Sequence, residues 1–150
     1  VRIPVVANGE IWTVADARRC LSESGCSAIM LGRGMVADPG LALAIRAELG
    51  WPACPGEAGR TWAQGGSWDA LQPLVHRYWR LIQPRVEPRH QAGRMKQWLN
   101  FLRRRHPQAE EAYQALRTLS DSRQVSAWLE AHIDRGAEVG DNHTCAPLAA

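Results

Sequence analysis

Apolar residues recur with two different patterns along this chain of 150 residues. Up to about residue 50 they form short continuous runs that alternate with amphipathic stretches, which is typical of buried strands alternating with helices. From residue 68 onward they recur every three or four positions, which indicates helices with one apolar face. The pattern therefore predicts an α/β segment over residues 1–50 and an all-α segment over residues 68–136.

The α/β segment begins with a predicted strand–helix–strand unit. Residues 3–7 and 27–31 are apolar runs, and we expect both to be strands buried on both faces, as parallel strands are. Between them, Thr13 is a good N-cap with Asp16 at the capping-box position, and Gly25 ends the helix. This order predicts parallel pairing of the two strands with a right-handed crossover.

Glycine and proline residues mark the end of the α/β segment. Asp38-Pro39-Gly40 precedes a predicted helix over residues 41–49, and residues 51–67 are rich in both amino acids. Such a composition is typical of a linker. We therefore expect residues 51–67 to join two domains.

The all-α segment predicts four helices that pack as a four-helix bundle. Ser67 is the expected cap of the first helix, and Pro107 lies near the start of the third. The fourth is expected from about Ser122 to Arg135, and residues 137–150 are expected to form a flexible tail. The apolar positions that define these helices are Leu71, Leu74, Val75, Tyr78, Ile82, Ala92, Met95, Trp98, Leu99, Leu102, Tyr113, Leu116, Leu119, Val125, Trp128, Leu129 and Ile133.

Charge is concentrated in the all-α segment, although the whole chain carries a net charge of only +3. Residues 76–106 contain nine basic residues and a single acidic one, Glu87, whereas residues 1–75 and 107–150 are net negative. A basic block between such flanks favours a polyanion as partner, and a solvated helix surface without a partner is the alternative. The basic residues of this block are Arg77, Arg80, Arg85, Arg89, Arg94, Lys96, Arg103, Arg104 and Arg105.

Composition and cysteine spacing argue against several classes of protein. Nowhere does the sequence contain the ~18 consecutive apolar residues that a membrane-spanning helix needs, and its first residues do not resemble a signal peptide. The four cysteines show no CxxC spacing, so no zinc site is expected. We expect a cytoplasmic monomer with reduced thiols, no metal and no membrane partner.

Two glycine-containing turns follow the two expected strands. Asn8-Gly9-Glu10 comes after the first strand and Gly32-Arg33-Gly34 after the second. The carboxyl ends of parallel strands share one edge, glycine lets the backbone approach an anion closely, and the N-terminus of a following helix adds favourable potential. The turns therefore predict a phosphate cradle, to which Arg33 adds a charged contact. Glycine-rich turns that hold no ligand are the alternative.

Three stretches of this sequence resemble the tRNA-dihydrouridine synthase family. Ile3-Pro4-Val5-Val6-Ala7-Asn8-Gly9-Glu10-Ile11 and Ala28-Ile29-Met30-Leu31-Gly32-Arg33-Gly34 are similar to the last two barrel strands of that family. Arg94-Met95-Lys96-Gln97-Trp98-Leu99-Asn100-Phe101-Leu102 is similar to a helix of the subgroup that modifies position 16 of the tRNA D-loop. The resemblance covers residues 1 to about 135. It implies the last βαβα part of a TIM barrel followed by a helical tRNA-binding domain.

The resemblance also implies a cofactor and site residues. Family members bind FMN, so the backbone of Asn8, Gly9, Glu10, Gly32 and Arg33 would hold its phosphate and ribityl chain. In the helix that resembles the position-16 subgroup, Arg94 and Lys96 match positions that contact tRNA. Phe101 would stack on a base or ribose, or else lie at the edge of the core. Trp98 is expected in the core, and Arg103 to Arg105 would clamp a phosphate or remain solvated near the end of their helix.

The same resemblance puts the acid catalyst outside this chain. Family members reduce a uracil ring of tRNA with a hydride from reduced FMN and a proton from a cysteine, and NADPH re-reduces the flavin. That cysteine belongs to an earlier part of the barrel, and none of Cys20, Cys26, Cys54 and Cys145 fits its place. We therefore expect no catalytic residue here, no activity of the chain alone, and a C-terminal fragment. A stand-alone RNA-binding module and another FMN barrel oxidoreductase are the alternative functions.

Overall fold

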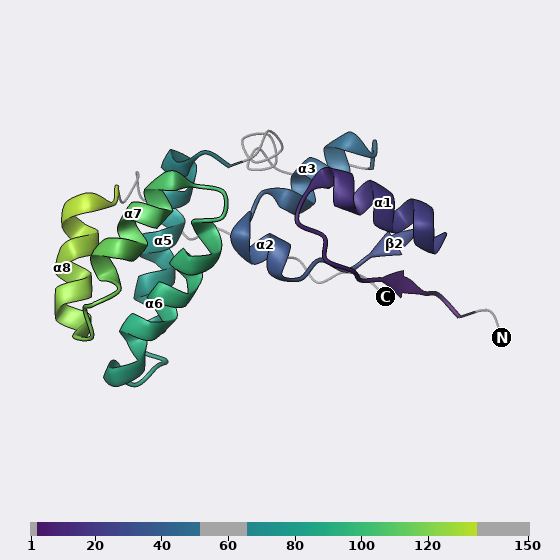
Figure 1. The fold of residues 1–150 in the computed structure, drawn as a ribbon. Coiled ribbons are helices and arrows are strands. Elements are labelled where there is room, and N and C mark those ends of the chain that lie inside the picture. The colour runs from purple at the N-terminus through teal and green to yellow at the C-terminus, as the bar shows by residue number, and fades with distance from the viewer. Residues whose placement is uncertain (1–2, 52–65, 135–150) are drawn as a thin grey trace, which may run out of the picture.

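The computed structural model describes residues 3–51 and 66–134 as two groups of elements, shown in Figure 1. We call residues 3–51 the α/β segment and residues 66–134 the helical segment. In the α/β segment the elements are β1 (Val6–Ala7), α1 (Val14–Ser24), β2 (Ala28–Ile29), α2 (Arg33–Ala37) and α3 (Leu41–Glu48). In the helical segment they are α5 (Trp68–Ile82), α6 (Pro88–Leu102), α7 (Pro107–Leu116) and α8 (Ser122–His132).

The predicted strand–helix–strand unit is present. β1 and β2 pair in parallel, with Val6 opposite Ala28. The Thr13 side chain accepts a hydrogen bond from the backbone of Asp16, whose carboxylate accepts one from the Thr13 backbone, so the capping box is confirmed. Gly25 adopts φ 65° and ends α1, as expected of a glycine that can take a left-handed backbone.

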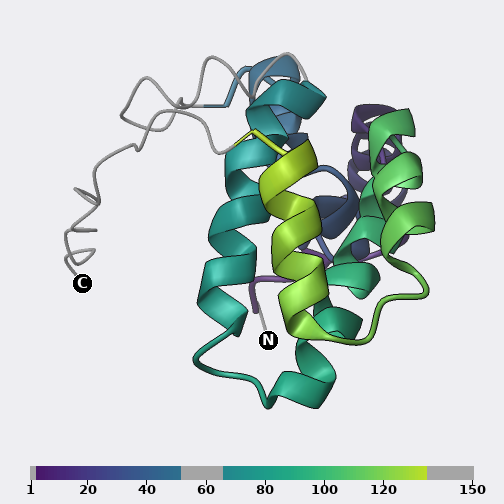
Figure 2. The same ribbon diagram turned by 90° about the vertical axis from the view of Figure 1, so that its left-hand side faces the viewer.

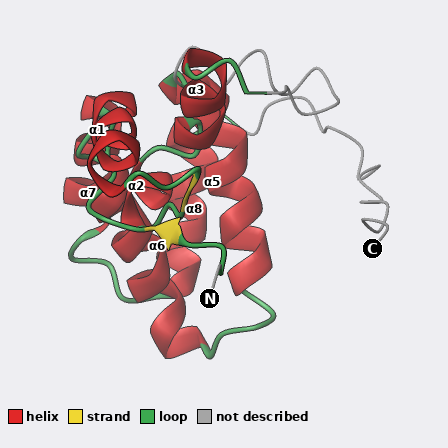
Figure 3. Cartoon of the chain, turned by 90° about the vertical axis from the view of Figure 1, so that its right-hand side faces the viewer, coloured by secondary structure: helices red, strands yellow, loops and turns green. Residues whose placement is uncertain are grey.

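The expectation that both strands are buried on two faces is wrong. Each strand is only two residues long, and apolar side chains remain exposed, among them Val5 at 57% and Met30 at 55%. Helix α1 covers one face of the pair (Figure 3), and no element of the described ranges 3–51 and 66–134 covers the other. Burial on two faces needs a layer on each side, and the described residues supply a layer on one side only.

The second glycine turn is not a simple loop. Gly32 caps α2, which occupies residues that the sequence places in a turn. The predicted helix over 41–49 is confirmed as α3, and the Asp38 carboxylate accepts a hydrogen bond of 3.0 Å from the Gly40 backbone just before it. A small core of Ile11, Ala17, Leu41 and Ile45 joins α1 and α3.

The helical segment packs around one continuous core, and Figure 2 shows its helices side by side. The Ser67 side chain caps α5 as expected, and Pro107 is the first residue of α7. Helix α6 contacts α5, α7 and α8, so it lies at the centre of the packing. The largest fully buried side chains of this core are Leu71, Val75, Met95, Leu99, Leu102, Leu116, Val125 and Leu129.

Helix α8 ends at His132, earlier than the predicted Arg135. Ile133 leaves the helix in an extended backbone conformation and buries its side chain in the core. Its carbonyl lies 2.7 Å from Nε2 of His76 on α5, and the next backbone N–H, of Asp134, donates to Gln72. These contacts give the chain partners outside the helix and so account for the early end.

Candidate phosphate site and nucleic-acid interface

The two glycine turns meet at one open hollow of about 220 Å³. They follow β1 and β2, whose parallel pairing brings their carboxyl ends to the same edge. Four of the five predicted cofactor residues line this hollow, and Gly9 does not. The lining consists of Asn8, Glu10, Ile11, Trp12, Gly32, Arg33 and Gly34.

Glu10 is held in an unusual conformation at the hollow. Its φ of 41° lies in the left-handed region that non-glycine residues rarely adopt. One carboxylate oxygen accepts a hydrogen bond of 2.8 Å from the Trp12 indole N–H, and the other accepts from the Arg33 guanidinium. The hydrogen bond from Trp12 and the charge of Arg33 hold the pKa of Glu10 below its ordinary value. Glu10 and Arg33 therefore form a charged pair beside the turns.

The glycines of the two turns have different surroundings. A Cβ added at Gly9 or Gly32 meets nothing within 4 Å, so the backbone there borders open space. A Cβ added at Gly34 would lie 2.0 Å from the Ile11 carbonyl oxygen. Gly9 and Gly32 therefore leave room for a ligand, whereas Gly34 is needed for the packing of α2 against the chain at Ile11.

Helix α1 offers less to an anion than the sequence suggests. Its N-terminus was expected to add favourable potential beside Asn8-Gly9-Glu10. The Asp16 carboxylate accepts hydrogen bonds from the backbone of Trp12 and Thr13, and the Thr13 hydroxyl accepts from Asp16. Because these groups bind one another and Asp16 is an anion, the helix end already has a negative partner.

On α6 the two basic residues predicted to contact tRNA have different environments. Arg94 is exposed, and its guanidinium lies 3.5 Å from the Gln97 amide oxygen. Lys96 donates from Nζ to the backbone carbonyls of Arg117 and Leu119, at 3.3 and 3.0 Å. Lys96 thus binds the chain just after α7, where a cation satisfies carbonyls at a helix end. Phe101 is half-buried.

The three consecutive arginines that follow α6 bind protein groups. Arg103 pairs with Glu110 of α7 at 3.0 Å, and its guanidinium lies 4.5 Å from the centre of the Tyr113 ring. Arg104 lies 4.5 Å from the centre of the Trp12 ring, and Arg105 pairs with Asp38 at 3.2 Å. The sequence predicted that these arginines clamp a phosphate or remain solvated, and neither prediction included these protein partners.

Trp98 lies at the junction of the two segments rather than deep in the helical core. Its half-buried ring packs edge-on against Tyr78, and its indole N–H donates to the Val36 carbonyl of α2 at 3.0 Å. The Arg105–Asp38 pair joins the same two segments. The end of α6 is therefore fixed against the chain around α2.

Sequence reasoning missed Trp12, Asp38 and Arg105 as residues of the site and its junction. Trp12 had one local signal, because it stands two residues after Glu10 at the end of the first turn. Asp38 was noted only before a helix and Arg105 only as part of the basic block, and 66 residues lie between them, so nothing in the sequence indicated that they pair. Only the packing of α2 on α6 brings them together.

No group of three or more metal-ligating side chains gathers among the residues that the structure describes. Cys20 and Cys26 are free and half-buried, and neither lines the hollow. Cys54 and Cys145, together with the predicted linker and tail, lie outside the described ranges. No helix within the described ranges is long and apolar enough to cross a membrane.

Comparison with known proteins supports the resemblance in both segments. Residues 1–53 match the family described as dihydrouridine synthase. The chain is 45% identical over 129 residues to a tRNA-dihydrouridine(16) synthase of Pseudomonas putida, and these residues are 86% of this chain and 37% of that protein.

Two further relatives carry the same name. One from Ralstonia nicotianae is 39% identical over 135 residues, which are 90% of this chain and 38% of that protein. One from Escherichia coli K12 is 32% identical over 131 residues, which are 87% of this chain and 37% of that protein. The chain thus spans a little more than a third of the length of these relatives, and the similarity extends well into the helical segment.

Proposed function

We propose that this chain is the C-terminal part of an FMN-dependent tRNA-dihydrouridine synthase that reduces a uridine at position 16 of tRNA. The observation that carries the proposal is the extent of the similarity, since 86% or more of the chain aligns with relatives of that name. A barrel oxidoreductase acting on a small molecule would not need the helical segment to be similar as well.

The hollow fits a phosphate monoester such as that of FMN. Gly32 lines the hollow and borders open space, so its backbone can come close to phosphate oxygens, and Gly9 leaves the adjoining first turn unobstructed. Arg33 lines the same hollow and can add a charge-assisted hydrogen bond. In the proposed enzyme these residues, with Asn8 and Glu10, hold the phosphate end of FMN. Bound FMN supplies the hydride for reduction of the uracil ring.

The helical segment would contribute tRNA contacts through α6. Arg94 is exposed and its guanidinium makes a long contact to Gln97, so it can reach a phosphate. Lys96 acts chiefly through its bonds to the chain after α7, which shape the neighbouring surface. A target base must leave its stack to reach the flavin, and contacts of this kind would offset that cost of a few kcal/mol.

Neither of the two cysteines that the structure describes is placed to donate the proton in this reaction. Cys20 lies within α1 and Cys26 lies just before β2, so neither reaches the hollow at the strand ends. The acid would come from the part of the protein that the relatives have and this chain does not cover. We therefore propose that the chain by itself does not reduce tRNA.

A chimera tests the proposed function. The corresponding C-terminal part of the Pseudomonas putida relative is replaced by this chain, and dihydrouridine at position 16 is measured by mass spectrometry of digested tRNA. We expect modification by the chimera and none by the chain alone. A chimera that folds and binds FMN but modifies no uridine would contradict the proposal. A chimera that binds tRNA but no flavin would favour the stand-alone RNA-binding function.

A substitution in the chimera tests the phosphate site. Gly32→Val should abolish FMN retention, because a branched side chain would fill the open space beside the turn. The control is Gly93→Ala, since Gly93 also has open surroundings but lies on α6, away from the hollow. Flavin absorbance of the purified proteins is the measurement. Full FMN content in Gly32→Val would place the cradle elsewhere.

A further inference from the structure

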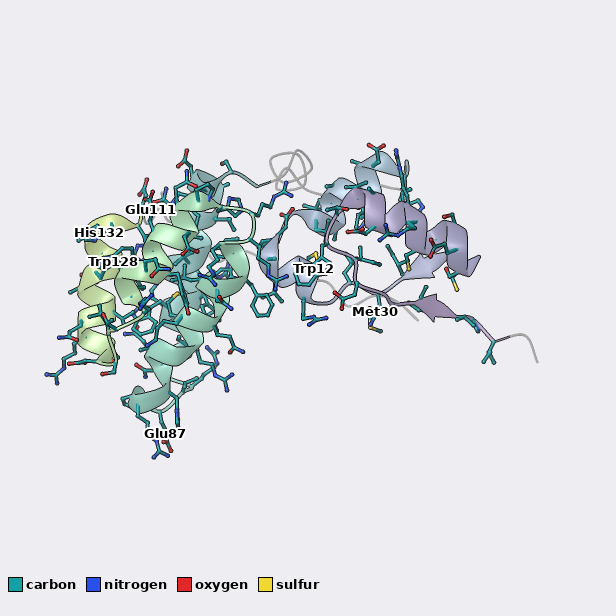
Figure 4. All side chains as sticks on the ribbon, viewed as in Figure 1. Trp12, Met30, Glu87, Glu111, Trp128 and His132 are labelled. Carbon is teal, nitrogen blue, oxygen red and sulfur yellow. The ribbon has the colours of Figure 1, made fainter. Side chains whose placement is uncertain are left out.

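One side chain of the helical segment reaches the edge of the candidate phosphate site. Arg104, just after α6, places its guanidinium 4.5 Å from the centre of the Trp12 ring. Figure 4 shows Trp12 on the side of the α/β segment that faces the helices. Arg33 also lies near this ring, with its guanidinium 5.7 Å from the ring centre. A single indole therefore contacts one cation from each segment.

Trp12 in turn contacts Glu10, which lines the hollow. Its indole N–H donates to one oxygen of the Glu10 carboxylate at 2.8 Å, and the other oxygen accepts from Arg33. Arg33 is the cation that the proposed function assigns to the phosphate. Arg104, Trp12, Glu10 and Arg33 thus form a continuous series of contacts from the end of α6 to the site.

The start of this series is held in place independently. The next residue, Arg105, pairs with the buried carboxylate of Asp38, and Asp38 also binds the Gly40 backbone. Seven residues earlier, Trp98 donates its indole N–H to the Val36 carbonyl. These two contacts fix the end of α6 on the α/β segment, so Arg104 approaches Trp12 from a defined position.

We propose that Arg104 is a positioning residue of the candidate phosphate site, which holds Trp12 and, through it, the Glu10–Arg33 pair, and thereby couples occupancy of the site to the position of α6. The proposal depends on the proposed function only in calling the hollow a phosphate site. Because α6 also carries Arg94, tRNA contact and cofactor contact would be linked, and such linkage acts equally in both directions.

The first test follows Glu10 and Trp12 in the full chain by NMR. The chain is ¹³C-labelled, and the Glu10 carboxyl is titrated in wild type, Arg104→Gln, Arg104→Lys and Arg103→Gln. We expect Arg104→Gln to raise the pKa of Glu10 towards its ordinary value and to speed hydrogen exchange at the Trp12 indole N–H. Arg104→Lys should restore both, because a lysine also stacks on an indole. Arg103→Gln removes the same charge one residue earlier, but Arg103 contacts Glu110 and Tyr113 of α7, so this variant should leave the Trp12 exchange rate unchanged.

Salt separates positioning from a simple attraction between the charges of Arg104 and Glu10. A direct coulombic effect of Arg104 on Glu10 is largely screened at ~1 M salt, whereas the release of Trp12 is not. The Trp12 exchange rate should therefore differ between wild type and Arg104→Gln at both low and high salt. Equal exchange rates in the two proteins, with the fold intact by circular dichroism, would overturn the proposal.

A second measurement separates this proposal from the proposed function. FMN is added to the full chain, and the amide signals of Gly9 and Gly32 report binding. Loss of one exposed cation–π contact corresponds to about a two- to fivefold weaker affinity for FMN in Arg104→Gln. If FMN shifts neither amide in wild type while Trp12 still responds to Arg104→Gln, the phosphate assignment fails and the positioning role of Arg104 stands.

Discussion

The two segments of this chain differ in how completely they bury their own apolar side chains. In the helical segment Met95, Leu99 and Leu116 are fully buried in a core to which all four helices contribute. In the α/β segment the core is small, and both the strand pair and an apolar hollow of about 380 Å³ beside Trp51 remain open. The helical segment therefore has the features of a self-sufficient unit, whereas the α/β segment presents surface that suits further protein.

The larger core and the candidate phosphate site therefore lie in different segments. The candidate phosphate site lies in the segment with the small core, and its glycine turns are tied to the helical segment through Trp12 and Asp38. A site on a weakly buried unit gains definition from contacts with a better-packed neighbour. The helical segment supports the turns, and in the proposed function it also offers basic residues to tRNA.

A truncated side chain in the helical core should reduce the stability more than any other substitution considered below. Leu99→Ala should lower the free energy of unfolding by about 3 kcal/mol, because it removes a fully buried side chain at the centre of the packing. Urea denaturation followed by circular dichroism measures the change. Asn100→Ala, at the exposed neighbouring position, is the control and should change the stability little. A loss below about 1 kcal/mol for Leu99→Ala would contradict the self-sufficient core.

A methyl group at Gly34 should destabilise the α/β segment alone. Its Cβ would meet the Ile11 carbonyl oxygen at 2.0 Å, so α2 must shift, at a cost of about 2 kcal/mol. Gly32→Ala, two residues earlier, meets nothing within 4 Å and is the control. Amide hydrogen exchange should show faster opening around Ile11 and Leu41 in Gly34→Ala, with the core of the helical segment unchanged. Uniform loss of protection in both segments would show that they unfold as one unit.

Arg94→Ala and Lys96→Ala should have different consequences. Arg94→Ala should weaken tRNA binding by about 1 kcal/mol and leave the stability unchanged, because the side chain is exposed. Lys96→Ala should weaken tRNA binding too, but unlike Arg94→Ala it should also lower the free energy of unfolding by about 1 kcal/mol. The reason is that the carbonyls of Arg117 and Leu119 lose their partner. Fluorescence anisotropy with labelled tRNA and urea denaturation measure the two quantities. Equal free energies of unfolding for Arg94→Ala and Lys96→Ala would contradict the structural role of Lys96.

The smallest effect concerns pH and His106. Burial lowers the pKa of His106, and the neighbouring Arg105 lowers it further against the opposing charge of Asp38. The folded protein therefore holds this ring neutral, and the unfolded chain takes up the proton first as the pH falls below about 6.5. The stability that His106 contributes is present above that pH and is lost as the pH falls towards the folded pKa. Melting temperatures between pH 7.5 and 5 should fall less steeply in His106→Gln than in wild type, and equal slopes would contradict this.

Local signals predicted much of this structure because the groups involved are close in sequence. Thr13 and Asp16 form the predicted cap, and Gly25 and Pro107 stand at the ends where glycine and proline are favoured. The two glycine turns also met as expected, since parallel strands leave little choice of edge. Such features depend on backbone geometry over a few residues.

Features that depend on tertiary contacts could not be predicted from the sequence. The apolar spacing of α6 placed Trp98 in the core, but helical periodicity cannot tell which neighbour an apolar side chain meets, and its indole binds Val36 instead. Lys96 and Arg105 belong to the basic block, and composition does not reveal that one binds carbonyls and the other Asp38. The charge of that block therefore overstates how many of its cations face solvent.

Binding of tRNA by the full chain at several salt concentrations tests whether α6 contacts tRNA. Each phosphate neutralised by an arginine or lysine releases counterions, so two or three such contacts predict a roughly 10- to 40-fold loss of affinity between ~50 and ~200 mM salt. We expect this dependence in wild type and a shallower one in Arg94→Ala. Weak binding that does not change with salt, or a slope that Arg94→Ala leaves unaltered, would contradict the assignment of α6 as the surface that contacts tRNA.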